Sequence, residues 1–224
     1  MCFTPIVSLS TAIFEFAVAT FILLYYKKSK INKTILLFIY MLGLYQFTEY
    51  MLCISKSPAL WAKIGFITYT FLPAVGLKFC IDYVKKKYNT LLIFVPPIAF
   101  SVLAILSKNF IIESSCAKYF VIIRNLFSSN SILMSAYVIY YLGFILFISY
   151  LLICHYKKQK NILKKKMDID VLIAIFASLV PALILLFILP SLSLQIGSIY
   201  CQFAVIFAVC ALAIFHLEKK LRRK

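Results

Sequence analysis

Long apolar runs separated by short polar connections dominate the sequence. Crossing a hydrocarbon core of roughly 30 Å takes about 20 helical residues, and seven runs approach or exceed that length. The fourth run is the shortest and the break before the last is narrow, so six or eight spans remain alternatives. The pattern predicts an all-α polytopic membrane bundle that forms one domain over 1–224, with seven transmembrane helices at 5–26, 35–54, 61–83, 89–106, 131–154, 170–190 and 195–216.

Charge is distributed unevenly along the chain and indicates the topology. The net charge is +17, and the lysines and arginines cluster at 27–33, 85–87, 157–166 and 219–224. These clusters fall on every second connection, which by the positive-inside rule predicts that the N-terminus lies outside and the C-terminus inside. Basic tracts beside helix ends favour anionic lipid headgroups. A nucleic-acid partner is therefore not expected.

The composition of the chain predicts where the protein is located. The chain is 64% hydrophobic and only 14% charged, far from the averages of soluble domains. The first run lacks a basic leader and a small-residue cleavage site, so it is interpreted as a retained helix. A multi-pass protein of the cell membrane is predicted, with the prokaryotic cytoplasmic membrane favoured by the small size. The connection 107–130 has the size of an extracellular cap, and output to the cytoplasm is expected to pass through a signalling partner.

Seven cysteines are many for 224 residues, and the predicted topology sorts them by side. Thiols exposed outside a cell can persist as disulfides, so four outer cysteines allow up to two bridges with three connectivities. The alternative is that cysteines simply pack well in helices. No Cys/His spacing typical of a metal site occurs, and neither a metal nor a cofactor is expected. The candidates for disulfides are Cys2, Cys53, Cys116 and Cys201, with Cys2 and Cys201 the first pair to test.

Polar residues inside three of the predicted spans form stripes at helical spacing. Ionisable groups within a membrane are costly, at about 2.5–3.5 kcal/mol on insertion scales, so they should face the bundle interior. All three stripes lie in the outer halves of their spans. Pointing them at one another would produce a polar pocket open towards the outside. The candidate ligand-binding residues are Glu15 in the first span, Gln46, Glu49 and Tyr50 in the second, Lys63 as counter-charge in the third, and Gln195 and Gln202 in the last.

Three further features have simpler interpretations. Gly43 continues the polar face of the second span and would let another helix approach closely. Lys78 and Asp82 stand at i, i+4 and are predicted to form a local ion pair. His155 and His216 lie at inner helix ends and are interpreted as interfacial residues rather than metal ligands.

Two resemblances follow from short motifs. The opening MCFTPIVS, the Gln46-x-x-Glu49 spacing and the Tyr200-Cys201 pair resemble a family of uncharacterised small multi-pass membrane proteins that begin MCFS and carry a Q-x-x-E motif. The chain departs from that pattern at Thr4, Tyr50 and Tyr200. On the matching positions the resemblance singles out Cys2, Gln46, Glu49 and Cys201, and it implies no activity.

The stretch from Trp61 to Phe79 resembles the third helix of the seven-helix sensor modules found at the N-terminus of membrane histidine kinases. That pattern has a tryptophan and a basic residue, then a proline, then a histidine-phenylalanine pair. Lys78 stands in place of the histidine. The resemblance implies seven-helix architecture with the N-terminus outside, and a sensory role exerted through a partner.

Three function classes remain. A sensor or receptor-like module with an outward polar pocket for a small ligand is the first hypothesis. An intramembrane lipid-modifying enzyme using Glu15 and Glu49 as general acid and base is the second, although no histidine or activated serine accompanies them. A small solute or proton transporter is the third, and it lacks the internal repeat typical of that class. A hydrogen-bond network that only fixes helix packing is the structural alternative for the same polar residues.

Overall fold

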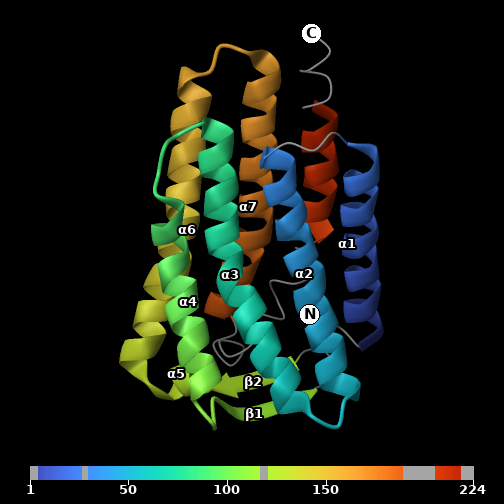
Figure 1. Ribbon diagram of the computed structural model, residues 1–224, viewed down its shortest axis with the longest axis vertical. Helices are drawn as coiled ribbons and strands as arrows, with labels where there is room; N and C mark the ends of the chain where they lie inside the picture. The colour runs from blue at the N-terminus through green and yellow to red at the C-terminus, as the bar shows by residue number, and fades with distance from the viewer. Residues whose placement is uncertain (1–4, 27–29, 117–120, 189–204, 218–224) are drawn as a thin grey trace.

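Long helices lie side by side along the long axis of the molecule (Figure 1). The computed structural model describes residues 5–26, 30–116, 121–188 and 205–217. Helices overlap the described part of every stretch expected to be helical. In order, the elements are α1 Pro5–Tyr25, α2 Lys30–Ile54, α3 Pro58–Val84, α4 Thr90–Leu106, β1 Ile111–Cys116, β2 Val121–Asn125, α5 Leu126–Ser129, α6 Ser131–Lys158, α7 Ile162–Ile188 and a last helix Val205–Leu217.

Local sequence signals set several helix ends. α3 begins at Pro58, where the missing N–H costs nothing because the first turn has no intrahelical acceptor for it. The side chains of Asn89 and Asn130 accept hydrogen bonds from backbone N–H groups of the first turns of α4 and α6. α3 ends at Val84, and the left-handed backbone (φ 56°) of the following cap residue Lys85 stops the helix. These caps fix where the chain reverses direction.

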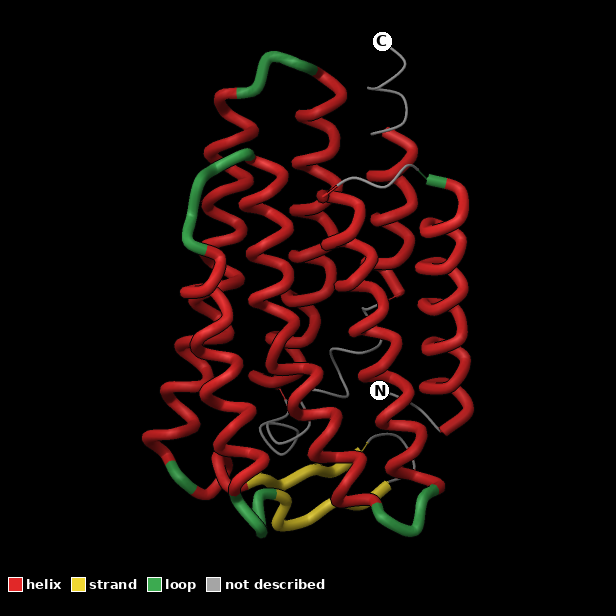
Figure 2. Tube along the Cα trace, in the orientation of Figure 1, coloured by secondary structure: helices red, strands yellow, loops and turns green. Residues whose placement is uncertain are grey.

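The two ends of the bundle differ in chemistry. One end, termed the hairpin end, carries β1, β2, α5 and the turn between α2 and α3 (Figure 2). The opposite end, termed the basic end, carries the α3–α4 connection and the α6–α7 connection (Figure 1). Exposed lysines of these two connections include Lys85, Lys86, Lys87 and Lys160. The basic clusters of these two described connections therefore lie at the same end of the bundle.

The connection after α4, at the hairpin end, contains a small antiparallel sheet, so the chain is not entirely helical. Glu113 pairs with Arg124 and Cys116 with Val121, with an irregularity between Ile111 and Glu113. Val, Ile and Ser-rich segments suit strands because branched side chains pack on a pleated surface. Leu126 N–H donates to the Phe110 carbonyl at 2.8 Å. The sheet thereby closes over the ends of the neighbouring helices.

α3 is the central helix of the bundle and contacts α2, α4 and α6. Its Thr70 hydroxyl forms a hydrogen bond with the Tyr137 hydroxyl of α6, with 3.0 Å between the oxygens. The Tyr140 hydroxyl donates to the Thr70 carbonyl at 2.7 Å. Because Thr70 also donates to the Phe66 carbonyl one turn earlier, the polar groups at this buried contact are mutually satisfied. The contact fixes α6 against the middle of α3.

The surface of the helices is apolar. Ile132, Ile139 and Leu91 are among the exposed large hydrophobic side chains, which a soluble protein would not leave in such number. Among the described residues, four helices are long and apolar enough to cross a membrane: Pro5–Tyr25, Asn32–Ile54, Pro58–Val84 and Ser131–Lys158. Thr90–Leu106 and Val205–Leu217 are shorter apolar helices. The molecule is thus a helical membrane bundle.

Candidate functional site

Glu15 lies on the buried face of α1. That face repeats every three or four residues and includes Ser8, Ala12, Glu15, Val18 and Ile22, so one side of α1 meets the bundle while the other is exposed. Glu15 is 0% exposed, and neither carboxylate oxygen has a hydrogen-bond partner among the described residues. A buried carboxylate without a donor is energetically costly, because water has been removed and nothing replaces it. A hydrogen-bond donor placed beside the Glu15 carboxylate would therefore lower the cost of burying it.

α2 presents the second part of the site. Gln46 and Glu49 are separated by three residues, so they share one helix face, and they are 1% and 2% exposed. The Tyr45 hydroxyl donates to Glu49 Oε1 at 2.9 Å, and the Tyr45 ring packs on that of Tyr69, with 5.7 Å between centroids. Both Gln46 and Glu49 have further interaction partners. Unlike Glu15, these two polar side chains are integrated into the packing.

The contact between α1 and α2 sets the relative depth of these residues. The hydroxyls of Thr20 and Tyr40 are hydrogen-bonded, with 3.1 Å between the oxygens. One turn nearer the hairpin end, the Phe16 ring packs directly on Gly43: an added Cβ would lie 2.8 Å from it, so a larger residue at this position would displace the ring. Because the helices are antiparallel, this register places Glu15 level with the polar stripe of α2 to within about one turn.

Lys63 does not act as the expected counter-charge. Its ammonium donates to the carbonyls of Ile105 and Ser107, both at 3.2 Å, rather than to a carboxylate in the described part of the chain. These carbonyls belong to the end of α4, where the last turn has no intrahelical N–H to bind them. A cation is also favoured there by the helix dipole. The prediction of Lys63 as partner of Glu15 or Glu49 was wrong for this physical reason.

The other candidate residues lie at the edge of the site or beyond the described residues. Tyr50 is half-buried, and its ring lies 6.3 Å from that of Phe47. Gln195 and Gln202 fall outside the described residues. Glu15 therefore lies on a helix adjacent to that of Gln46 and Glu49 and at a similar depth, with Tyr50 one turn nearer the hairpin end than Gln46.

A disulfide joins two of the candidate cysteines. Cys53 at the end of α2 is bonded to Cys116 at the end of β1, with 5.2 Å between their Cα atoms. Cys53 lies on the helix face that carries Gln46 and Glu49, two turns from Gln46 and one turn from Glu49. Cys2 and Cys201 lie outside the described residues. The bond ties the sheet to the helix that carries the polar stripe.

The basic end contains polar pairs of its own. Lys78 Nζ and Asp82 Oδ2 are 2.9 Å apart, which confirms the predicted ion pair. His155, expected to be an interfacial residue, instead holds the carboxylate of Asp168: its Nδ1 lies 3.0 and 2.9 Å from the two oxygens. Asp168 is 0% exposed. The Tyr83 ring packs edge-on against the imidazole at 5.2 Å, so α3, α6 and α7 meet at this pair.

The site offers carboxylate and amide oxygens and no metal cluster. Among the described residues, no group of three or more His, Cys, Asp or Glu side chains could hold a metal ion. Oxygen acceptors of this kind recognise hydrogen-bond donors and cations. Glu15, Gln46 and Glu49 thus provide acceptor oxygens of the kind that bind N–H groups and cations.

One comparison with known proteins identifies a relative. The family model described as the N-terminal 7TM region of histidine kinase matches residues 7–218. The match covers nearly the whole chain, including the stretch from Trp61 to Phe79. No curated protein and no solved structure matches the chain.

Proposed function

Because the chain belongs to the family of N-terminal seven-transmembrane regions of histidine kinases, we propose that this membrane sensor module binds a small polar or cationic ligand in a pocket around Glu15, Gln46 and Glu49. The pocket would lie in the half of the bundle nearer the hairpin end. Gln195 and Gln202 of the predicted seventh span and Tyr50 would complete its walls. Signal would pass to a cytoplasmic partner or kinase domain.

The observation that carries the proposal is the state of Glu15. Its carboxylate is fully buried without a donor among the described residues, whereas the neighbouring Glu49 accepts a hydrogen bond from Tyr45. A ligand with an ammonium or N–H group would replace the solvation that Glu15 has lost, and charge-assisted hydrogen bonds are the stronger kind. A residue retained only for packing would be expected to have such a partner within the protein.

Two features support an outward orientation of this pocket. Lysines gather at the basic end, which the positive-inside rule assigns to the cytoplasm. The Cys53–Cys116 disulfide lies at the hairpin end, and disulfides persist on the oxidising side of a membrane. The proposed topology of seven spans with the N-terminus outside is consistent with both. The lysines of the basic end would also contact anionic lipid headgroups.

α3 is the proposed route for the signal. It runs from the hairpin end, where Lys63 caps α4, through Thr70 in contact with α6, to Tyr83 beside His155. Pro73 lies within it and removes one backbone hydrogen bond. A ligand that binds one arrangement of α1 and α2 more tightly than another would shift the population of α3 positions.

Ligand binding to the purified full chain tests the proposal. We expect one of a panel of small amines and zwitterions, such as putrescine, choline and free amino acids, to raise the melting temperature of the protein in lipid nanodiscs. The Glu15→Gln variant should lose that shift, because it removes the charge while keeping the shape. Glu113→Gln, which changes an exposed glutamate of β1, is the matched control and should keep it.

A melting temperature that no probe raises in a Glu15-dependent manner would contradict the proposal. Native mass spectrometry of the protein extracted in its own lipids gives a second readout. A bound small molecule that is present in the wild-type protein and absent from Glu15→Gln is the expected result.

A further inference from the structure

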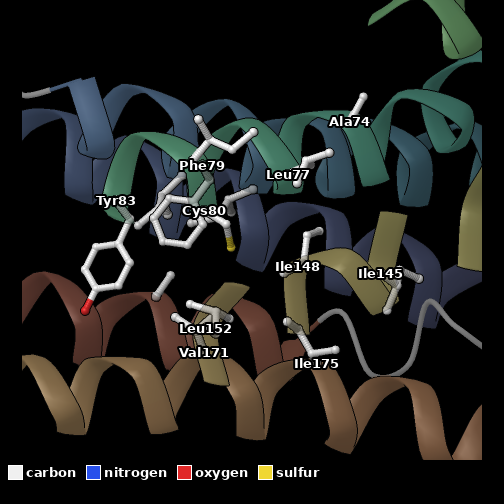
Figure 3. Packing of buried hydrophobic residues seen from close by; sticks show 14 of the residues in the cluster. Ala74, Leu77, Phe79, Cys80, Tyr83, Ile145, Ile148, Leu152, Val171 and Ile175 are labelled. Carbon is white, nitrogen blue, oxygen red and sulfur yellow. The ribbon is translucent and has the colours of Figure 1, made fainter. Parts of the chain in front are cut away.

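An apolar cavity lies between the helices on the basic side of Thr70. It has a volume of about 90 Å³ and is lined by residues of α2, α3, α6, α7 and the last helix. Figure 3 shows part of this region, where Cys80 of α3 points towards Ile148 of α6 and Val171 of α7. The cavity is separate from the polar pocket, because neither Glu15, Gln46 nor Glu49 is among its lining residues.

The walls consist almost wholly of hydrocarbon and aromatic side chains. No described lining residue is charged, and the heteroatoms come only from the thiols of Cys80 and Cys210 and the phenol of Tyr141. A buried water needs two to four polar partners, so water is a poor occupant of such a space. Left empty, the lining side chains lose dispersion contacts on one side. An apolar occupant would restore them.

The extent of the cavity lining indicates the size of the occupant. On α3 its lining runs from Leu72 to Cys80, which is about 12 Å at 1.5 Å per residue. On the last helix it runs from Phe207 to Ile214, a similar length. The lining residues thus extend over about two helical turns on both helices, along a cavity of about 90 Å³. A single hydrocarbon chain can lie along walls of this length.

We propose that this cavity binds one hydrocarbon chain, either the tail of a free fatty acid or an acyl tail of a membrane lipid. The occupant would pack against Gly76, where an added Cβ would come into ordinary contact with Ile148 Cδ1 at 3.4 Å and with the Phe38 ring at 3.6 Å, so a side chain longer than a methyl group would have to extend into the cavity or displace these neighbours. The proposal does not rest on the polar pocket, since a different part of the bundle carries it.

Occupation of the cavity would act on the basic end of the bundle. Phe79 lines the cavity, and its ring stacks on that of Tyr83 with 6.0 Å between centroids. Tyr83 in turn packs against His155, which holds Asp168. A chain bound in the cavity therefore contacts the first member of a continuous series of side chains that joins α3 to α6 and α7.

Photolabelling of the full chain in phosphatidylcholine and phosphatidylglycerol nanodiscs tests the proposal. One arm uses dodecanoic acid that carries a diazirine in its chain, and the other uses a phospholipid with the same diazirine in one tail. We expect saturable labelling of the peptide around Gly76 and Cys80, competed by unlabelled dodecanoic acid in the first arm. Labelling by the free acid identifies a fatty acid as the occupant, and labelling by the phospholipid alone identifies a lipid tail.

Two glycine variants provide the specific test. Gly76→Leu fills the cavity and should reduce the saturable labelling at least fivefold. Gly143→Leu adds the same side chain to α6 at a position where a Cβ meets nothing within 4 Å, and it should leave labelling unchanged. Ala174→Phe, on the α7 wall, repeats the test if Gly76→Leu does not fold. Glu15→Gln should keep the labelling, so failure of the polar pocket would not be confused with failure of this site.

Labelling of equal strength in Gly76→Leu, Ala174→Phe and Gly143→Leu would overturn the proposal. Labelling confined to the lipid-facing side chains, such as Leu91 and Ile139, would do the same, because it would show only bulk contact with the bilayer.

Discussion

Glu15 and Asp168 are both 0% exposed carboxylates in a membrane bundle, yet their surroundings differ completely. Asp168, near the basic end, has both oxygens within 3.0 Å of His155 Nδ1. Glu15, on α1, has no donor among the described residues. Burial alone therefore does not show what a carboxylate does in this molecule. The difference lies in the internal partner: Asp168 joins α6 and α7 through His155, whereas the Glu15 carboxylate is left to accept from the proposed ligand.

Removal of Asp168 should have the largest effect on stability. Asp168→Ala leaves His155 facing an apolar void between α6 and α7, and breaking a buried pair in this way costs about 3–5 kcal/mol. Asp170→Ala, a half-buried aspartate two residues on in the same helix, is the control and should cost less than about 1 kcal/mol. Unfolding in mixed micelles by titration with SDS measures both values. Equal losses of stability in the two variants would show that Asp168 is not a structural carboxylate, and its contrast with Glu15 would fail.

The disulfide should have the next largest effect. Cys53 and Cys116 close a loop with a sequence separation of 63 residues, and loss of such a bond costs about 2–4 kcal/mol. The Cys53→Ser, Cys116→Ser double variant should therefore unfold at a lower SDS fraction. Cys154→Ser, which alters a free cysteine of α6, is the control. If the double variant unfolds like the control, the hairpin end is held by its packing and not by the bond.

The sequence predicted the helices far better than the contacts at their ends. An apolar run of about 20 residues is a local signal that tertiary contacts hardly alter, and the i, i+4 spacing of Lys78 and Asp82 likewise defines its own ion pair. The hairpin between Ile111 and Asn125 was not predicted, because it depends on pairing between two strands and not on a local pattern. The Val and Ile residues of its strands could have indicated it. Lys63 was misassigned because its acceptors are backbone carbonyls, which no pattern of side chains reveals.

The pair of His155 and Asp168 was missed for a related reason. The two residues lie on successive helices joined by a short connection, and such helices lie antiparallel, so residues within about two turns of the connection on either side can meet. Taken alone, each residue has the position in the sequence that is typical of a polar group at the membrane interface. Glu15 and Glu49 could be placed on buried faces from helical spacing, but whether a buried group has a donor depends on the packed structure.

Glu15→Leu should raise stability, opposite in sign to the first two variants. Replacing a buried carboxylate that lacks a donor with an apolar side chain removes a desolvation cost, and a gain of about 1–2 kcal/mol is expected. Gln46→Leu is the matched control on α2. Because Gln46 has interaction partners, its replacement should lower stability by about 1 kcal/mol. A destabilised Glu15→Leu variant would show that Glu15 is a structural carboxylate like Asp168, and the binding side of the comparison would fail.

The smallest effect is expected at an ion pair of the hairpin end that is not buried. Arg124 Nη1 and Glu113 Oε2 are 3.7 Å apart across the two strands, and their side chains are 55% and 51% exposed. Such pairs contribute less than about 0.5 kcal/mol, because water and salt screen both charges. A double-mutant cycle with Arg124→Ala and Glu113→Ala should therefore give a coupling energy below about 0.5 kcal/mol that vanishes at high salt. A coupling as large as that between His155 and Asp168 would mean that the sheet is shielded from solvent by something beyond the chain's own side chains. The coupling energy of a polar pair would then no longer increase with its burial in this molecule. The contrast between Glu15 and Asp168 would need another cause.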